Sequence, residues 1–285
     1  MQTATLGIVG SGIMGSGIAE VAAKAGVDVI LRSRQQAGAD AMVAALERSL
    51  AKQVDRGKLD AAEAEAVTGR ITATSDLDAL ADCDLVLESV VEDLDVKKQL
   101  FVELDRLVKD GGILATNTST LPVVELAVET GRPEQVVGIH FFNPAPAMAL
   151  VEVIRTLVSS DEAVAAAVDF AEACGKDPVV VEDRAGFIVN ALLFPYLNNA
   201  VRMLENRTAS REDIDSAMKG GCNFPMGPLA LLDLVGLDTS VAILDALYTE
   251  FRDPNYAAVP LLRRMVAAGH LGRKSGQGFY DYARK

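Results

Sequence analysis

A glycine-rich turn near the N-terminus constrains the fold of this chain more than any other feature. The apolar run Ala4–Val9 is followed directly by Gly10-Ser11-Gly12-Ile13-Met14-Gly15, and a helical stretch continues to Ala25. Gly26 is suited to end that helix, and a second apolar run, Val27–Leu31, follows it. The order of strand, glycine turn, helix and strand predicts a βαβ unit.

Each glycine of the turn has a physical role in this context. Gly10 permits a tight turn, Gly12 lets the backbone approach a pyrophosphate, and Gly15 lets the helix pack closely on the strand. The helix N-terminus at Ile13 and Met14 supplies free N–H groups and a partial positive charge. Although glycines can serve a purely structural turn, a flanking strand and helix favour a dinucleotide site.

The end of the second strand indicates which dinucleotide binds. Enzymes that use NAD usually carry Asp or Glu at this point, which accepts a hydrogen bond from the ribose 2′-hydroxyl. This chain has Arg32-Ser33-Arg34 instead. A 2′-phosphate would be repelled by a carboxylate but could be held by Ser33 and Arg34. We therefore expect NADP(H) to be favoured over NAD(H), although arginines at a strand end can also be merely solvated.

Further apolar runs extend the sheet at a spacing typical of alternating strands and helices. They are Asp84–Leu87, Gly112–Ala115, Val136–Ile139, Val151–Ile154 and Pro178–Val181. The pattern predicts an α/β fold with a Rossmann-type doubly wound sheet domain over residues 1–183. A helical hairpin insertion is expected at about residues 40–70.

The hydrophobic pattern of the sequence changes after residue 183. Phe187–Leu204 is apolar around most of its circumference, which predicts a buried helix. No strand pattern follows until Phe279-Tyr280. We therefore expect an all-helical C-terminal domain over residues 184–285 that contributes to substrate binding and dimerisation.

Composition excludes several classes of function. The net charge of −13 argues against nucleic-acid binding, which needs basic patches. No apolar run reaches the roughly 18 residues of a membrane span. Two histidines and three cysteines without a CxxC motif predict no metal site and reduced thiols. The first basic residue is Lys24, so we expect no signal peptide and a cytoplasmic protein.

Two polar residues follow predicted strands, where ligands bind in open α/β sheets. His140 ends the strand that begins near Val136, and Ser119 follows the strand that ends at Ala115. His270 lies in a helix–turn stretch without such a context. A lone histidine is more often structural, but His140 is the best acid–base candidate in this chain.

Two further polar residues interrupt apolar segments. Glu152 lies in Leu150–Ile154 and could point to solvent from an edge strand; if it is buried it needs a partner such as an imidazole. Asn190 lies in the apolar stretch after Phe187, where an isolated amide requires hydrogen bonds or a ligand.

Seven motifs together resemble those of the 3-hydroxyacyl-CoA dehydrogenase family, in particular its stand-alone 3-hydroxybutyryl-CoA dehydrogenases. They are GSGIMGSGIAE, ESVVEDLDVKKQLF, NTST, GIHFFNPAPAMALVEV, DRAGFIVN, FPMGPLALLDLVGLD and GRKSGQGFYDY. The similarity extends over essentially the whole chain and is far more specific than the glycine turn alone.

The resemblance implies a role for individual residues. His140 would be the general acid–base and Glu152 its partner, while Ser119 and Asn190 would bind the substrate oxygen. The nicotinamide half of the cofactor site would be lined by Glu92, Lys97, Asn117, Ser119, Asn143 and Lys274. Two departures from the family stand out: Ser33 replaces the usual Asp, which puts a preference for NAD in doubt, and Ala191 replaces a frequent Arg.

The resemblance also places coenzyme A against Ser49 and Arg56. These residues share one helix face, and Arg48, Lys52 and Arg56 form a cationic stripe on the same predicted helix. As charges alone, the stripe would more often be a solvated face. In an acidic chain, it is the cation cluster that an anionic acyl-CoA substrate requires.

Two alternatives stay open from the sequence. A relative could oxidise a free hydroxy acid or a sugar acid, and a non-enzymatic relative could be a crystallin-like protein or a nucleotide sensor. The joint presence of Ser119, His140, Glu152 and Asn190 favours an enzyme over the second class. Apolar residues on the helix after Phe187, including Leu192, Leu193, Leu197 and Val201, favour a homodimer.

Overall fold

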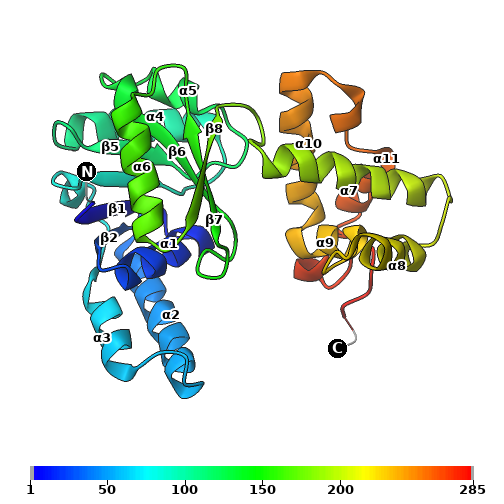
Figure 1. Cartoon of the computed structure of the whole chain (residues 1–285), viewed down its shortest axis with the longest axis horizontal. Helices are drawn as coiled ribbons and strands as arrows, with labels where there is room; N and C mark the ends of the chain where they lie inside the picture. Colours follow the sequence, from blue (N-terminus) through cyan, green and yellow to red (C-terminus); the bar gives the residue numbers. More distant parts are fainter. Residues whose placement is uncertain (1–2, 284–285) are drawn as a thin grey trace. The chain divides into compact units, whose positions relative to one another are not determined.

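The chain divides into two compact units, each with its own hydrophobic core. The computed structural model describes residues 3–283. Its contacts separate residues 1–183 from residues 184–285. The first unit contains the sheet and the second is built from helices (Figure 1). The expected Rossmann-like sheet followed by a helical C-terminal region is confirmed.

Eight strands form one sheet in the order β3-β2-β1-β4-β5-β6-β7-β8. Their bounds are β1 Thr5–Val9, β2 Asp28–Arg32, β3 Ile71–Thr74, β4 Leu85–Glu88, β5 Ile113–Thr116, β6 Val136–Phe141, β7 Leu150–Arg155 and β8 Asp177–Glu182. All neighbouring strands pair in parallel except β6 and β7, which are antiparallel. The carboxyl ends of β1, β4, β5 and β6 therefore lie along one edge.

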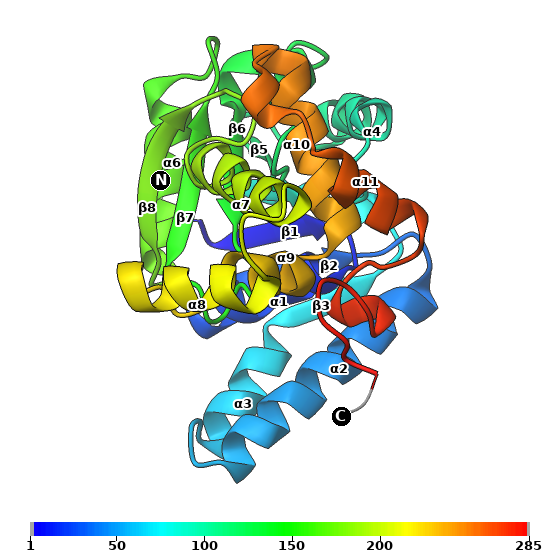
Figure 2. The same cartoon turned by 90° about the vertical axis from the view of Figure 1, so that its right-hand side faces the viewer.

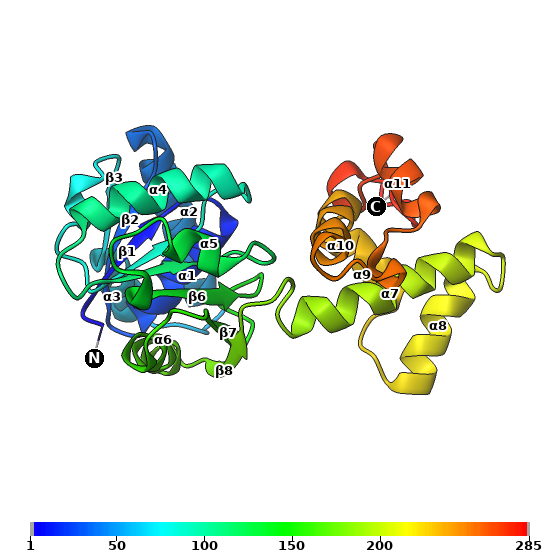
Figure 3. The same ribbon diagram turned by 90° about the horizontal axis from the view of Figure 1, so that it is seen from above.

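Helices cover both faces of the sheet (Figure 3). The helices α1 (Ile13–Lys24) and α6 (Asp161–Ala173) share one core with the strands, whereas α4 (Leu94–Leu107) and α5 (Val123–Ala127) lie on the opposite face. Gly26, with φ +90°, follows the C-cap of α1 as its sequence position indicates. The pair α2 (Gln36–Asp55) and α3 (Ala61–Gly69) extends beyond the sheet as a helical hairpin (Figure 2).

The second unit contains α7 (Val189–Glu205), α8 (Arg211–Cys222), α9 (Pro228–Val235), α10 (Leu237–Phe251) and α11 (Pro260–Ala267). Short 3-10 turns lie at Asp78–Leu80, Pro133–Gln135, Pro254–Tyr256 and Arg273–Ser275. The prediction that the helix after Phe187 is buried all round is wrong for one face, because Leu192 is 72% exposed whereas Leu197 is buried. The helix begins only at Val189 because Phe187 has φ +49°.

The prediction of a strand at Phe279-Tyr280 is also wrong. The amides of Phe279 and Tyr280 donate to the buried carboxylate of Asp233, at 2.8 and 2.9 Å, rather than to a neighbouring strand. The only β-type pairings described in this segment are single bridges between Gly272 and Gln277 and between Gln277 and Asp281. The Asp233 carboxylate therefore accepts the hydrogen bonds that the backbone of a neighbouring strand would accept.

Candidate active site

The glycine turn has the geometry of a phosphate cradle at the N-terminus of α1. A β-carbon at Gly10 would lie 2.2 Å from the Ser89 carbonyl oxygen, and one at Gly15 would lie 2.0 Å from the Gly10 carbonyl oxygen. Only glycine fits these two positions. A β-carbon at Gly12 would meet nothing within 4 Å, so the backbone is open there. The first amides of a helix have no intrahelical acceptor, and this open cradle fits a pyrophosphate.

The second strand ends beside this turn. The Gly10 amide donates to the carbonyl oxygen of Arg32 at 3.0 Å, which joins the two segments. Ser33 is buried, and its hydroxyl lies 2.8 Å from the hydroxyl of Ser11. Arg32 turns its guanidinium toward the Ser75 carbonyl oxygen, whereas Arg34 is exposed. The ribose end of the candidate cofactor site therefore carries hydroxyls and an exposed cation.

His140 and Glu152 form a buried pair across the antiparallel strands β6 and β7. The two residues are direct partners in the register, and His140 Nδ1 lies 2.8 Å from Glu152 Oε2. Both side chains are almost inaccessible, at 5% and 1% exposure. Glu152 does not point to solvent, because its side chain meets the imidazole of His140 on the same face of the sheet. The structure thus selects the buried arrangement from the two that the sequence left open.

Ser119 lies at the opposite nitrogen of the imidazole. Its hydroxyl is 3.1 Å from His140 Nε2. A carboxylate can only accept, so Nδ1 donates to Glu152, and Nε2 of the neutral ring is then an acceptor for the serine. Nearby, Asn117 Oδ1 accepts the amide hydrogen of Phe141 at 2.8 Å, which joins the ends of β5 and β6. Three predicted residues, Ser119, His140 and Glu152, are therefore brought into one hydrogen-bonded series.

Glu92 and Lys97 adjoin this series from the loop after β4 and from α4. Glu92 Oε1 accepts from the Thr118 hydroxyl at 2.5 Å and from the Ser119 amide at 2.9 Å. Burial alone would raise the pKa of Glu92, but the charge of Lys97 and these hydrogen bonds lower it below its usual value. Lys97 itself is only 1% exposed and contacts Glu92 Oε2 at 3.1 Å. It therefore reaches the site through Glu92.

Three further predicted site residues belong to other segments of the chain. Asn143 follows β6 and is exposed. Asn190 and Lys274 belong to the second unit: Asn190 is buried in the first turn of α7, and Lys274 pairs with Asp238 at 2.6 Å.

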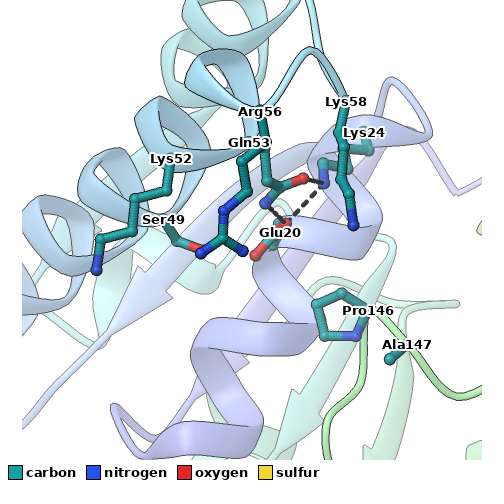
Figure 4. Close-up of a pocket in the computed structure, with 9 residues that line it drawn as sticks. All are labelled: Glu20, Lys24, Ser49, Lys52, Gln53, Arg56, Lys58, Pro146 and Ala147. Atoms are coloured by element: carbon teal, nitrogen blue, oxygen red, sulfur yellow. Dashed lines mark hydrogen bonds and ion pairs between the residues drawn. The ribbon is translucent and has the colours of Figure 1, made fainter.

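A cationic cavity of about 420 Å³ opens between α1, α2 and the loop after β6. It is lined by Glu20, Lys24, Ser49, Lys52, Gln53, Arg56, Lys58, Pro146 and Ala147. Arg48 of the predicted stripe does not line it. Glu20 is neutralised by Lys24 at 2.7 Å, and three further cations line the cavity. In Figure 4 the guanidinium of Arg56 extends toward Ser49 and Glu20, whereas Lys52 points away from them.

Comparison with known proteins decides the family. The model for the NAD binding domain of 3-hydroxyacyl-CoA dehydrogenase matches residues 5–184, and that for its C-terminal domain matches residues 186–282. The chain belongs to the 3-hydroxyacyl-CoA dehydrogenase family. It is 49% identical to 3-hydroxybutyryl-CoA dehydrogenase of Mycobacterium tuberculosis over 279 residues, which are 97% of this chain and 98% of that one.

A solved structure gives the same result. The (S)-3-hydroxybutyryl-CoA dehydrogenase PaaH1 from Ralstonia eutropha is similar with a TM-score of 0.96 and 43% identity over 99% of each chain. A 3-hydroxybutyryl-CoA dehydrogenase of Clostridioides difficile is 47% identical over 277 residues, 97% of this chain and 99% of the relative. The family resemblance indicated by the seven motifs is confirmed.

Along residues 3–283, no helix is long and apolar enough to cross a membrane, and no group of three metal-ligating side chains is found.

Sequence reasoning missed several residues of the cavity and of the candidate active site. Lys24 and Lys58 add positive charge to the cavity from outside the predicted stripe. Glu88, the last residue of β4, is completely buried beside Lys97. Both residues lie in the motif ESVVEDLDVKKQLF, from which this pair could have been predicted.

The open position at Gly12 gives a direct test of the cofactor cradle. Gly12→Ala should leave the thermal unfolding midpoint unchanged, because the new methyl group meets no protein atom. The same methyl group would occupy space that a pyrophosphate needs, so the Kd for NADH or NADPH should rise at least about tenfold. Nucleotide fluorescence measures the binding. Gly69→Ala in α3, which also meets nothing within 4 Å, is the matched control.

Proposed function

We propose that this chain is an NAD(P)-dependent 3-hydroxybutyryl-CoA dehydrogenase that interconverts 3-hydroxybutyryl-CoA and acetoacetyl-CoA. The observation that carries the proposal is His140, held at Nδ1 by Glu152 and facing the Ser119 hydroxyl at Nε2. This arrangement suits the transfer of one proton to or from an alcohol oxygen. The names of the relatives from M. tuberculosis, C. difficile and R. eutropha support the same substrate.

The protein residues handle the proton of this reaction. When it is bound against Gly10, Gly12 and Gly15, the nicotinamide cofactor supplies the hydride chemistry. His140 Nε2 receives the proton when the alcohol is oxidised and returns it when the ketone is reduced. Glu152 keeps the imidazole in the orientation that leaves Nε2 available. Ser119 donates a hydrogen bond to the oxygen as negative charge develops.

Removing the imidazole tests this assignment. His140→Ala should lower kcat for acetoacetyl-CoA reduction by at least about a hundredfold, because a positioned acid–base group typically contributes about 10²- to 10⁴-fold. Cofactor affinity should change little. Steady-state kinetics and direct nucleotide binding measure the two effects. With His270→Ala as the matched control, a His140 variant that kept near-normal kcat would exclude this residue from proton transfer.

The cationic cavity provides the binding site for coenzyme A in this proposal. Ser49 and Arg56 line it together with Lys52 and Lys58. Positive charge in one cavity of an otherwise acidic chain complements the phosphates of the coenzyme. These contacts lie on a part of the substrate that does not react, so they should strengthen binding in the ground state and in the transition state alike.

Truncation of Arg56 tests the coenzyme A site. Arg56→Ala should raise KM for acetoacetyl-CoA by about tenfold with little change in kcat, because a charge-assisted hydrogen bond contributes about 1.5–3 kcal/mol. Arg48→Ala, an exposed arginine of the same helix that does not line the cavity, should leave KM unchanged. An equal loss with a substrate truncated to the pantetheine portion would place the action of Arg56 elsewhere.

The preferred cofactor in this proposal is NADP(H) rather than NAD(H). The support is the Arg32-Ser33-Arg34 segment, which carries one hydroxyl group, 2.8 Å from that of Ser11, and an exposed guanidinium where a carboxylate would repel a 2′-phosphate. The absence of a side chain at Gly38 keeps the space beside the Ser33 hydroxyl open, since a β-carbon at Gly38 would lie 2.8 Å from that hydroxyl oxygen.

A charge substitution tests the cofactor preference. Before mutation, kcat/KM should be at least about tenfold higher with NADPH than with NADH, since one charge-assisted bond is worth more than 1.4 kcal/mol. Ser33→Asp should shift the ratio toward NADH by repelling the phosphate and accepting from the ribose hydroxyl. Ser33→Ala, which adds no charge, is the control. Equal kcat/KM for the two cofactors in the unmodified enzyme would refute the preference.

We also propose that the enzyme is a homodimer formed through the exposed side of α7. Leu192 and Met203 are exposed by 72% and 44%, and apolar surface of this kind is commonly covered in oligomers. Leu197 and Val201, which the sequence also suggested for this interface, are buried in the core of their own unit.

A further inference from the structure

Glu88 is a fully buried carboxylate at the carboxyl end of β4. It pairs in the register with Val9, the residue before the glycine turn. Its oxygens accept from Lys97 Nζ at 2.7 and 2.8 Å, from the Thr116 hydroxyl at 2.7 Å and from the Val90 amide at 2.5 Å. Four hydrogen bonds from three segments therefore hold one carboxylate in a single position.

The burial of Glu88 and Lys97 determines how they can act. The exposed fractions of their side chains are 0% and 1%, so neither can touch a molecule bound in the site. Replacing a buried ion pair by apolar residues often costs little or even adds stability. Stability alone therefore does not account for this pair, and any effect on the reaction must pass through a neighbouring residue.

Glu92 is that neighbour. The ammonium group of Lys97 lies between the two carboxylates, 2.7 Å from Glu88 Oε1 and 3.1 Å from Glu92 Oε2. The other oxygen of Glu92 accepts the Ser119 amide hydrogen at 2.9 Å. The Ser119 hydroxyl in turn lies 3.1 Å from His140 Nε2. Polar contacts thus run without a break from Glu88 to the imidazole.

A second route starts from the same carboxylate. Thr116 ends β5 and donates its hydroxyl hydrogen to Glu88 Oε2, and the same hydroxyl oxygen accepts the Thr118 amide hydrogen at 3.2 Å. The Thr118 hydroxyl donates to Glu92 Oε1 at 2.5 Å. The loop that carries Ser119 is therefore tied to Glu88 from both sides, through Lys97 and through Thr116.

We propose that Glu88 is a positioning residue of the reaction, which holds Lys97 and Thr116 so that Glu92 keeps Ser119 in place against His140. The inference rests on the proposed function through the roles of Ser119 and His140. Without the Glu88 carboxylate, Lys97 would have only Glu92 as an acidic partner, and the Thr116 hydroxyl would lose its acceptor. The Ser119 loop would then sample positions in which its hydroxyl no longer faces Nε2.

Two substitutions of different severity test the proposal. Glu88→Gln should lower kcat for acetoacetyl-CoA reduction at least about tenfold while KM for acetoacetyl-CoA stays within about twofold, because the coenzyme A cavity is untouched. Thr116→Val keeps the shape of the side chain and changes no charge, so it should fold even if Glu88→Gln does not. It should lower kcat about threefold, and Thr116→Ser should restore it.

Hydrogen exchange of the Ser119 amide in the protein without cofactor is the second readout. Exchange should become at least about tenfold faster in Thr116→Val and in Glu88→Gln if that variant folds, and should return to the parent rate in Thr116→Ser. Parent-like exchange and kcat in folded Thr116→Val would overturn the proposal, as would equal losses in the valine and serine variants. Absence of acetoacetyl-CoA reduction in the unmodified protein would instead refute the proposed function, while the exchange rates still tested the role of Glu88.

Discussion

The antiparallel pairing of β6 and β7 is the constraint on which the candidate active site depends. It sets His140 directly opposite Glu152, so both side chains leave the same face of the sheet and meet at 2.8 Å. A slip of the register by one residue would turn Glu152 to the other face, because side chains alternate along a strand. The buried carboxylate would then lack its imidazole partner, and the ring would lose its fixed orientation.

Parallel pairing elsewhere in the sheet brings the other components to the same edge. β1 ends at the glycine turn, where Gly10 packs against the Ser89 carbonyl after β4. β5 ends before Asn117, whose side chain accepts from the backbone of Phe141 in β6. The cofactor cradle and the proton-transfer residues therefore share one backbone framework. This framework requires glycine at positions 10 and 15, since a β-carbon at either position would collide with backbone atoms.

Features of the fold with local signals could be predicted from the sequence. The glycine turn predicted the first βαβ unit, and the histidine at the end of an apolar run predicted the residue to which we assign proton transfer. The strand β3 was missed because only one of its four residues, Ile71, is buried, which leaves little hydrophobic pattern. The Phe279-Tyr280 segment looked like a strand, but its amides pair with Asp233, a partner 46 residues away in the sequence.

Long-range pairing explains what sequence reasoning left undecided at the site. From the sequence, Glu152 was equally compatible with solvent and with burial, and its pairing opposite His140 in the antiparallel register decides for burial. Glu88 ends an apolar strand, and a carboxylate at that position is ordinarily the first exposed residue. The burial of Glu88 is possible because Lys97, nine positions later, donates a hydrogen bond to its carboxylate. The cavity cations Lys24 and Lys58 come from α1 and from the turn after α2, so no single helical stripe could reveal them.

The state of the His140 ring nitrogens tests the central claim most directly. The chain has only two histidines, so ¹⁵N chemical shifts of the imidazole rings can be assigned by comparison with His270→Ala. We predict that the neutral His140 ring carries its proton on Nδ1, which donates to Glu152, and has a bare Nε2 toward Ser119. Glu152→Ala, which removes the acceptor, should abolish this preference. A proton on Nε2 of the neutral ring, or an unchanged tautomer in Glu152→Ala, would contradict the arrangement on which the proposed proton transfer rests.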